Sequence, residues 1–161
     1  MKTCTTLFLI IFLFNTGKSQ DVTCDQLVYF AGGGKGGYAL KETKLNGVEI
    51  RTINVRLSYL LISLSLTNKS TCFEKGQPVT FILSDDTQIQ LPNDNEVTSS
   101  TEGHINLGGQ HKHNEELQQL KNKKIRAIQI PTKSGSMNVD LTEAEQARLH
   151  QVLNCLSEKL Q

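Results

Sequence analysis

Three histidines in a polar stretch of the chain have the spacing that most readily suggests chemistry. His111 and His113 are two residues apart, and His104 precedes them. Side chains at positions i and i+2 of an extended segment project to the same side, so this pair is placed to bind one metal ion. His104 or Glu102 would complete the ligand set if the Gly108-Gly109 turn folds the segment back. Neutral imidazole suits Zn, Cu or Ni. The competing interpretation is a polar loop with exposed histidines, because no HExxH pattern accompanies them.

The cysteines offer a second kind of chemistry. Cys4 belongs to the first nineteen residues, which we expect to be removed as a signal peptide, and this leaves Cys24, Cys72 and Cys155. An odd number of cysteines in an exported chain predicts one disulfide and one remaining thiol, or a covalent dimer. We favour a Cys72–Cys155 disulfide, which would tie a C-terminal helix to a sheet, with Cys24 as the alternative partner. A free Cys72 beside a histidine would instead suggest a thiol-dependent enzyme.

A glycine-rich segment matches a nucleotide-binding pattern only in part. Gly32, Gly34 and Gly37 satisfy G-x-G-x-x-G. That fingerprint requires a following helix, whereas residues 38–42 are predicted to be extended. Lys35 is followed by glycine rather than by Ser or Thr, so the Walker pattern fails as well. We therefore interpret residues 32–37 as a flexible loop.

The first nineteen residues are typical of a secretory signal peptide. Lys2 supplies a positive start, residues 7–14 form an unbroken apolar run, and the small residue Ser19 ends the segment. The run is too short to span a bilayer, and no later run is long enough. We expect residues 20–161 to form a single exported domain that is periplasmic, on the cell surface or secreted.

The charge balance of the remaining chain excludes some partners. Two of the seventeen basic residues, Lys2 and Lys18, belong to the signal peptide, while all sixteen acidic residues remain. This near-neutral balance gives no reason to expect nucleic acid or an anionic membrane surface as a partner.

Alternating apolar residues predict a chain of strands. Residues 79–83 and 88–91 predict a hairpin around the turn residues 84–87. Residues 125–130 and 137–141 predict another, with Pro131 ending the first strand. The apolar parity shifts within residues 53–66, which predicts a bulge or a strand buried on both faces.

The remaining segments are predicted to be an exposed excursion and two helices. Residues 93–124 form the polar excursion, which ends in a short helix over 115–121 capped by Asn114. The C-terminal helix spans 142–160 and begins at a capping box of Thr142 and Glu145. Its apolar stripe consists of Leu149, Val152, Leu153, Leu156 and Leu160. The predicted fold class is α+β, mainly β: an antiparallel sheet or sandwich of hairpins covered by a C-terminal helix.

The C-terminal half resembles a group of known proteins. The hairpin over 79–91, the run 120–130 and the helix end Leu153-Asn154-Cys155-Leu156 resemble small uncharacterised exported proteins of Bacteroidota-type bacteria. This resemblance covers about eighty residues by pattern. It implies a periplasmic or surface location and a compact β-rich domain, and it implies no catalytic residues.

These observations favour a small non-enzymatic binding or structural domain. Its partner surface would be the glycine-rich loop together with the polar excursion, and its partner another envelope protein or a glycan. The first alternative is a transition-metal-binding protein that uses His104, His111 and His113. The second is a thiol-dependent enzyme that uses Cys72. A dimer through the odd cysteine is a further possibility.

Overall fold

Ten strands and three helices make up the part of the chain that the structure describes. The computed structural model describes residues 23–31, 37–40, 43–45, 48–56, 59–68, 71–94, 100–107 and 114–158. The predicted signal peptide, residues 32–36 of the glycine-rich loop and residues 95–99 and 108–113 of the polar excursion lie outside these ranges.

The larger sheet is built around a long antiparallel pair, β4 (Val48–Arg56) and β5 (Tyr59–Leu66). β8 (Glu102–Asn106) pairs with the other side of β5. On the far side of β4, β3 (Thr43–Leu45) pairs with the beginning of β4 and β2 (Gly37–Leu40) with its end. β1 (Val28–Ala31) then pairs with β2. The order along the sheet is therefore β1-β2-β4-β5-β8, with β3 beside β4.

The second sheet has four antiparallel strands in the order β10-β9-β6-β7. It contains both predicted hairpins. The first is β6 (Val79–Leu83) with β7 (Gln88–Leu91), and the second is β9 (Ile125–Thr132) with β10 (Gly135–Asp140). β6 and β9 pair with each other and so join the two hairpins into one sheet.

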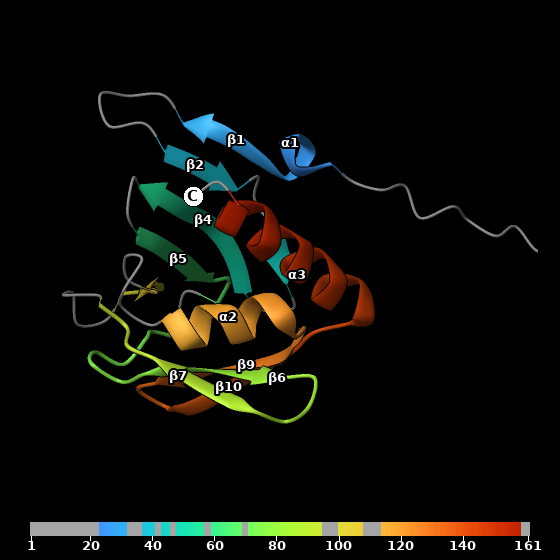
Figure 1. Cartoon of the computed structure of the whole chain (residues 1–161). Coiled ribbons are helices and arrows are strands. Elements are labelled where there is room, and N and C mark those ends of the chain that lie inside the picture. The colour runs from blue at the N-terminus through green and yellow to red at the C-terminus, as the bar shows by residue number, and fades with distance from the viewer. Residues whose placement is uncertain are drawn as a thin grey trace, which may run out of the picture.

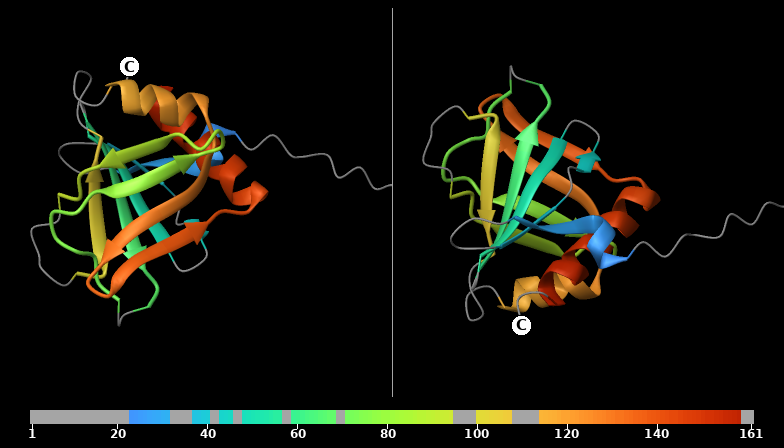
Figure 2. Two further views of the ribbon diagram at one scale, coloured as in Figure 1. Left: turned by 90° about the horizontal axis from the view of Figure 1, so that it is seen from below. Right: turned by 90° about the horizontal axis from the view of Figure 1, so that it is seen from above.

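Two isolated bridges connect the sheets. Asn93, just beyond β7, bridges Ile105 of β8, so the edge of the second sheet leads directly into the first. Phe73 bridges Thr132 at the end of β9, and its backbone N–H donates to the Ser100 carbonyl at 2.9 Å. The strands therefore follow an almost continuous path from β10 round to β1 (Figure 2).

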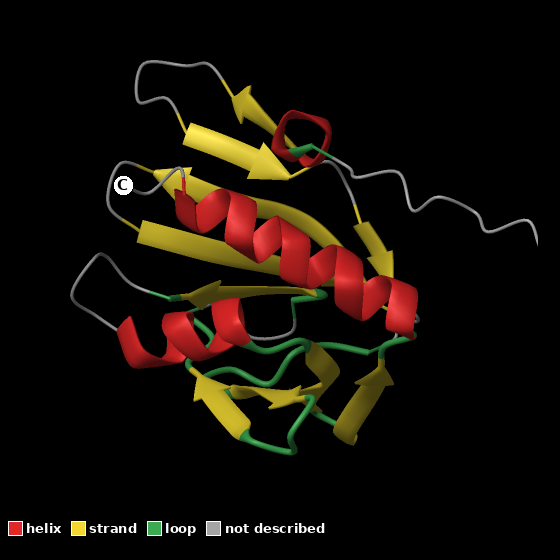
Figure 3. Cartoon of the chain, turned by 45° about the vertical axis from the view of Figure 1, so that its right-hand side comes forward, coloured by secondary structure: helices red, strands yellow, loops and turns green. Residues whose placement is uncertain are grey.

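The helices complete the enclosure of the core. α3 (Glu143–Glu158) lies across β4 and β5 (Figures 1 and 3). α2 (Asn114–Asn122) packs beside α3, and α1 (Cys24–Leu27) packs against the C-terminal part of α3. Leu149, Val152 and Leu153 of α3 are buried in one apolar cluster shared by both sheets and α2. Removing a side chain of this size from water stabilises the fold by about 1.5–3 kcal/mol.

The capping box that predicted the start of α3 is confirmed. The Thr142 N–H donates to Glu145 Oε2 at 2.8 Å, and the Glu145 N–H donates to Thr142 Oγ1 at 3.4 Å. The predicted fold class is confirmed as well: the chain is mainly β, with antiparallel sheets followed by a C-terminal helix.

Three predictions about the strands need correction. The parity change in 53–66 falls at the chain reversal between β4 and β5. The irregular register lies earlier, within β4 between Ile50 and Thr52. Part of the predicted excursion is β8, whose Ile105 is fully buried. Pro131 lies within β9 rather than ending it. It is tolerated there because the nitrogen, which has no hydrogen to donate, faces away from β10.

Candidate functional site

Alternation along β4, β5 and β8 separates a buried face from a polar face. On the buried face, Ile50, Leu64 and Gly103 lie opposite one another on the three strands. The neighbouring residues point the other way because side chains alternate along a strand. We call this second surface the β5–β8 polar face. It carries Glu49, Ser63, Ser65, Glu102, His104 and Asn106, together with the half-buried Leu61, which is paired with Asn106. The three strands lie side by side in Figure 2.

One row of this face places a hydroxyl between two carboxylates. Glu49, Ser65 and Glu102 are paired across β4, β5 and β8. Side chains that face each other across antiparallel strands have Cβ atoms about 4.5–5.5 Å apart. The short Ser65 side chain is only 5% exposed, whereas both glutamates are half-buried. This row is therefore rich in hydrogen-bond acceptors.

The adjacent row contains a Ser–His hydrogen bond. Ser63 and His104 are directly opposed on β5 and β8, and Ser63 Oγ lies 3.1 Å from His104 Nδ1. Both side chains are half-buried. A contact through Nδ1 fixes the orientation of the imidazole ring and leaves Nε2 as its second functional nitrogen.

The backbone of His104 is held from the other side by the segment that follows β7. Its N–H donates to Asn93 Oδ1 at 3.0 Å, and its carbonyl accepts from the Asp94 N–H at 2.8 Å. Asn93 is 5% exposed. His104 is thus supported by both sheets at the point where they join.

This geometry defines a surface for hydrogen bonding rather than a complete nucleophilic site. A serine acts as a nucleophile when a base, a group that orients the base and donors for an oxyanion are all in place. Ser63 and His104 supply a hydroxyl and an imidazole. We therefore assign no catalytic role to Ser63.

Of the three histidines predicted to form a metal site, one lies in the part of the chain that the structure describes. His104 lies in β8, while His111 and His113 lie outside the described residues. Within the described residues, no group of three or more His, Cys, Asp or Glu side chains could hold a metal ion.

The predicted Cys72–Cys155 disulfide was wrong in one of its two cysteines, Cys72. Cys155 is bonded to Cys24, the alternative partner, and Cys72 is a half-exposed free thiol. The reason is that α1 packs on the C-terminal part of α3, where the Cα atoms of Cys24 and Cys155 are 5.4 Å apart. Cys72 precedes the bridge between Phe73 and β9.

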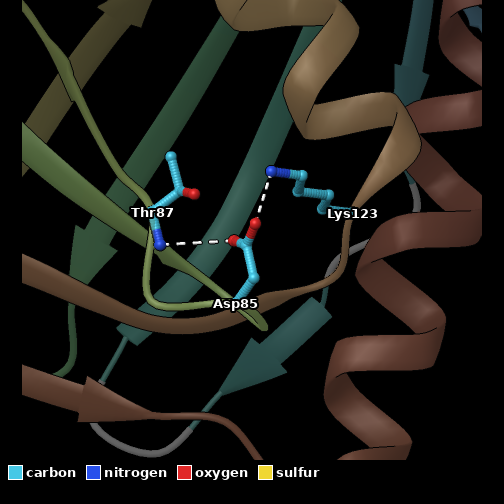
Figure 4. A network of polar contacts seen from close by, with 3 residues as sticks. All are labelled: Asp85, Thr87 and Lys123. Carbon is cyan, nitrogen blue, oxygen red and sulfur yellow. Dashed lines mark hydrogen bonds and ion pairs between the residues drawn. The ribbon is translucent and has the colours of Figure 1, made fainter.

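A separate charged cluster fastens the turn between β6 and β7 (Figure 4). Lys123 Nζ lies 2.5 Å from Asp85 Oδ2, and Arg126 Nη2 lies 2.6 Å from Asp86 Oδ1. The hydrogen bond from Lys123, followed by that from the Thr87 side chain and, to a smaller extent, by the one from the Thr87 N–H, lowers the pKa of Asp85 to about 2. Because all four charged groups are exposed or nearly so, we interpret this cluster as a structural clamp.

Sequence reasoning overlooked most of the polar face. It selected His104 and Glu102 but not Glu49, Ser63 or Ser65. The available signal was the alternation of Ile62, Leu64 and Leu66 with two serines, which marks a strand with one polar side.

Two further findings concern membrane-spanning helices and similarity to known proteins. Among the described residues, no helix is both long and apolar enough to cross a lipid bilayer. No family model matches the sequence, and neither a curated protein nor a solved structure matches it.

Proposed function

We propose that this chain is an exported, disulfide-stabilised binding domain whose ligand surface is the β5–β8 polar face. Its ligand is a neutral, hydroxyl-rich molecule, a glycan. Export is supported by the signal-like first nineteen residues and by the Cys24–Cys155 disulfide, since such bonds persist in oxidising compartments. The resemblance to exported proteins of Bacteroidota-type bacteria agrees with this location.

The observation that carries the proposal is the arrangement of the two polar rows. Two carboxylates, the Ser63 hydroxyl and an imidazole, all half-buried, lie on three adjacent strands, and the register fixes their spacing. Such groups accept and donate hydrogen bonds to the many hydroxyls of a sugar chain. A sheet face is also extended along its strands, which suits a linear ligand.

The negative charge of this face favours a neutral ligand over an anionic one. Glu49 and Glu102 both lie on it, and they would repel phosphate, sulfate and nucleic acid. Neutral hydroxyls can instead donate to carboxylates in hydrogen bonds that are stronger than those between neutral groups.

The test is a glycan array followed by titration calorimetry. The double variant Ser63→Ala/Glu102→Gln removes hydrogen-bonding groups from the face, and we expect binding to weaken at least about tenfold, which corresponds to about 1.4 kcal/mol. The matched control Ser84→Ala/Glu74→Gln changes the same residue types at exposed positions elsewhere and should bind normally. Absence of any glycan binding, or equal loss in both variants, would contradict the proposal.

A second candidate is transition-metal binding through His104. The Ser63 contact at Nδ1 is of the kind that orients metal-binding histidines and leaves Nε2 for the metal. Calorimetry with Zn²⁺, Cu²⁺ and Ni²⁺ should then show binding that His111→Ala/His113→Ala abolishes. Unchanged binding in that variant would exclude a site built from the three histidines.

A further inference from the structure

The outer side of β10 is an open edge of the second sheet. β10 pairs with β9 on one side, and no described strand pairs with its other side. Figure 2 shows it as the outermost strand of this sheet. The opposite edge is different, because the chain continues from β7 to Asn93 and bridges β8.

The hydrogen-bond register shows which backbone groups face outward. The Leu141 N–H donates to the Arg126 carbonyl at 2.9 Å, in line with the β9–β10 pairing. Hydrogen-bonded and non-bonded pairs alternate in an antiparallel ladder, so the odd-numbered residues of β10 bond to β9. The N–H and C=O groups of Ser136, Asn138 and Asp140 therefore point away from β9, and all three residues are exposed.

β10 has few of the features that usually protect such an edge. Natural edges are blocked by charged side chains, lysine above all, and by prolines, bulges or very short strands. β10 has six residues with neither lysine nor proline, its one charged residue, Asp140, is the last of the strand, and its register with β9 is continuous throughout. By contrast, the β4–β5 and β6–β9 pairs both contain register shifts.

We propose that β10 pairs with β10 of a second copy of this chain. The two strands run antiparallel about a twofold axis at Asn138, so that the second sheets of the two copies form one continuous sheet. A twofold contact uses the same patch on both copies, which must therefore be complementary to itself.

The sequence of β10 satisfies this condition in the register centred on Asn138. Asn138 faces Asn138 of the second copy, and Asp140, the one charged residue of the strand, faces the neutral Ser136. No like charges are opposed. Beyond the strands, the same register brings Lys133 of one copy towards Glu143 of the other, which have opposite charges. Half-buried Met137 lies across from Val139 and becomes more covered.

The first test measures mass as a function of concentration, by sedimentation or by light scattering after size exclusion. An interface this small predicts a weak dimer, so the protein is loaded up to about 100 μM, a hundred times a micromolar dissociation constant. We expect dimer to accumulate with concentration, both in the wild type and in Cys72→Ser. A monomer throughout overturns the proposal, as does a dimer that Cys72→Ser abolishes.

Matched substitutions at Asn138 then test the edge itself. Asn138→Pro removes an N–H that points outward, whereas Asn138→Ala keeps it. The proline variant should dimerise at least about tenfold more weakly and the alanine variant nearly normally. Circular dichroism and thermal unfolding confirm that each variant folds. Equal dimerisation of two folded variants overturns the proposal.

Cross-linking tests the register. In the Cys72→Ser background, Asn138→Cys places two thiols across the axis, where Cα atoms of a bonded pair are about 5.5 Å apart, within reach of a disulfide. Ser136→Cys faces Asp140 of the second copy and should not cross-link. Efficient cross-linking through residue 136 instead of 138 contradicts the proposed register.

Discussion

At the scale of single residues, Gly103 is the position where one added methyl group is expected to matter most. A Cβ built on Gly103 would lie 2.6 Å from Cε1 of Phe73, whose ring is almost fully buried. The ring cannot move away easily because the Phe73 backbone is bonded to Ser100 and bridged to Thr132. We expect Gly103→Ala to lower the free energy of unfolding by about 1–3 kcal/mol in urea denaturation.

A second substitution distinguishes this clash from other effects of replacing glycine. In the double variant Phe73→Leu/Gly103→Ala, the smaller side chain leaves room for the methyl group, so the two costs should not add. Gly76→Ala provides a contrast, because Gly76 has φ of 74° and nothing within 4 Å of its Cβ position. Its cost of about 1 kcal/mol should come from backbone strain, and Phe73→Leu should leave it unchanged. Simple additivity at Gly103 would show that Phe73 is not the cause.

At the scale of elements, one hydrogen bond joins the two longer helices. His150 of α3 lies with Nε2 2.7 Å from the carbonyl oxygen of Lys121, near the end of α2. A carbonyl only accepts, so Nε2 carries the proton and donates. We expect His150→Leu to destabilise the protein by about 1 kcal/mol. His150→Gln keeps a donor at a similar reach and should restore most of this loss in thermal unfolding.

The turn between β6 and β7 is expected to make stability depend on pH. Asp85 has a pKa lowered from 3.8 to about 2, chiefly by the hydrogen bond from Lys123. A lowered pKa in the folded state means that the contribution of Asp85 is fully present above pH 3.8 and is lost as the pH falls through about 2. The stability difference between wild type and Asp85→Asn should therefore shrink over that range.

Salt provides the control for this interpretation. The pair is exposed, so 1 M salt, with a screening length of about 3 Å, should reduce the wild-type advantage at neutral pH. A pH-independent difference between the two proteins would show that the Lys123 contact does not act through charge.

At the scale of the whole molecule, the Cys24–Cys155 disulfide closes a loop of almost the entire described chain. The two residues are 131 positions apart, so the bond strongly restricts the unfolded state. We expect Cys24→Ser/Cys155→Ser to lower the free energy of unfolding by about 3–5 kcal/mol. Reductant should have the same effect on the wild type. Cys72→Ser is the control and should change stability little, and a large loss in this variant would contradict the assigned pairing.

A structural feature could be predicted from the sequence when it is caused by residues that are close together in the chain. The hairpin over 79–91 and the capping box of Thr142 and Glu145 arise from neighbouring residues, and both were predicted. The strand β8 was not predicted, because Gly103 and the polar residues of this segment leave the buried Ile105 without an alternating apolar pattern. The partner of Cys155 depends on where α1 meets α3, and the β5–β8 polar face depends on the register of three strands. Neither arrangement is encoded in any short stretch of the chain.

The disulfide also determines how the domain would carry mechanical load. If the protein is held at one end of the chain and pulled at the other, tension enters near Cys24 and leaves near Cys155, passing through the covalent bond. The sheets and the polar face between these cysteines then bear almost no force. A domain of this kind can be tethered in flow or between two surfaces without being unravelled, and reduction of one bond would expose the whole fold to the pull.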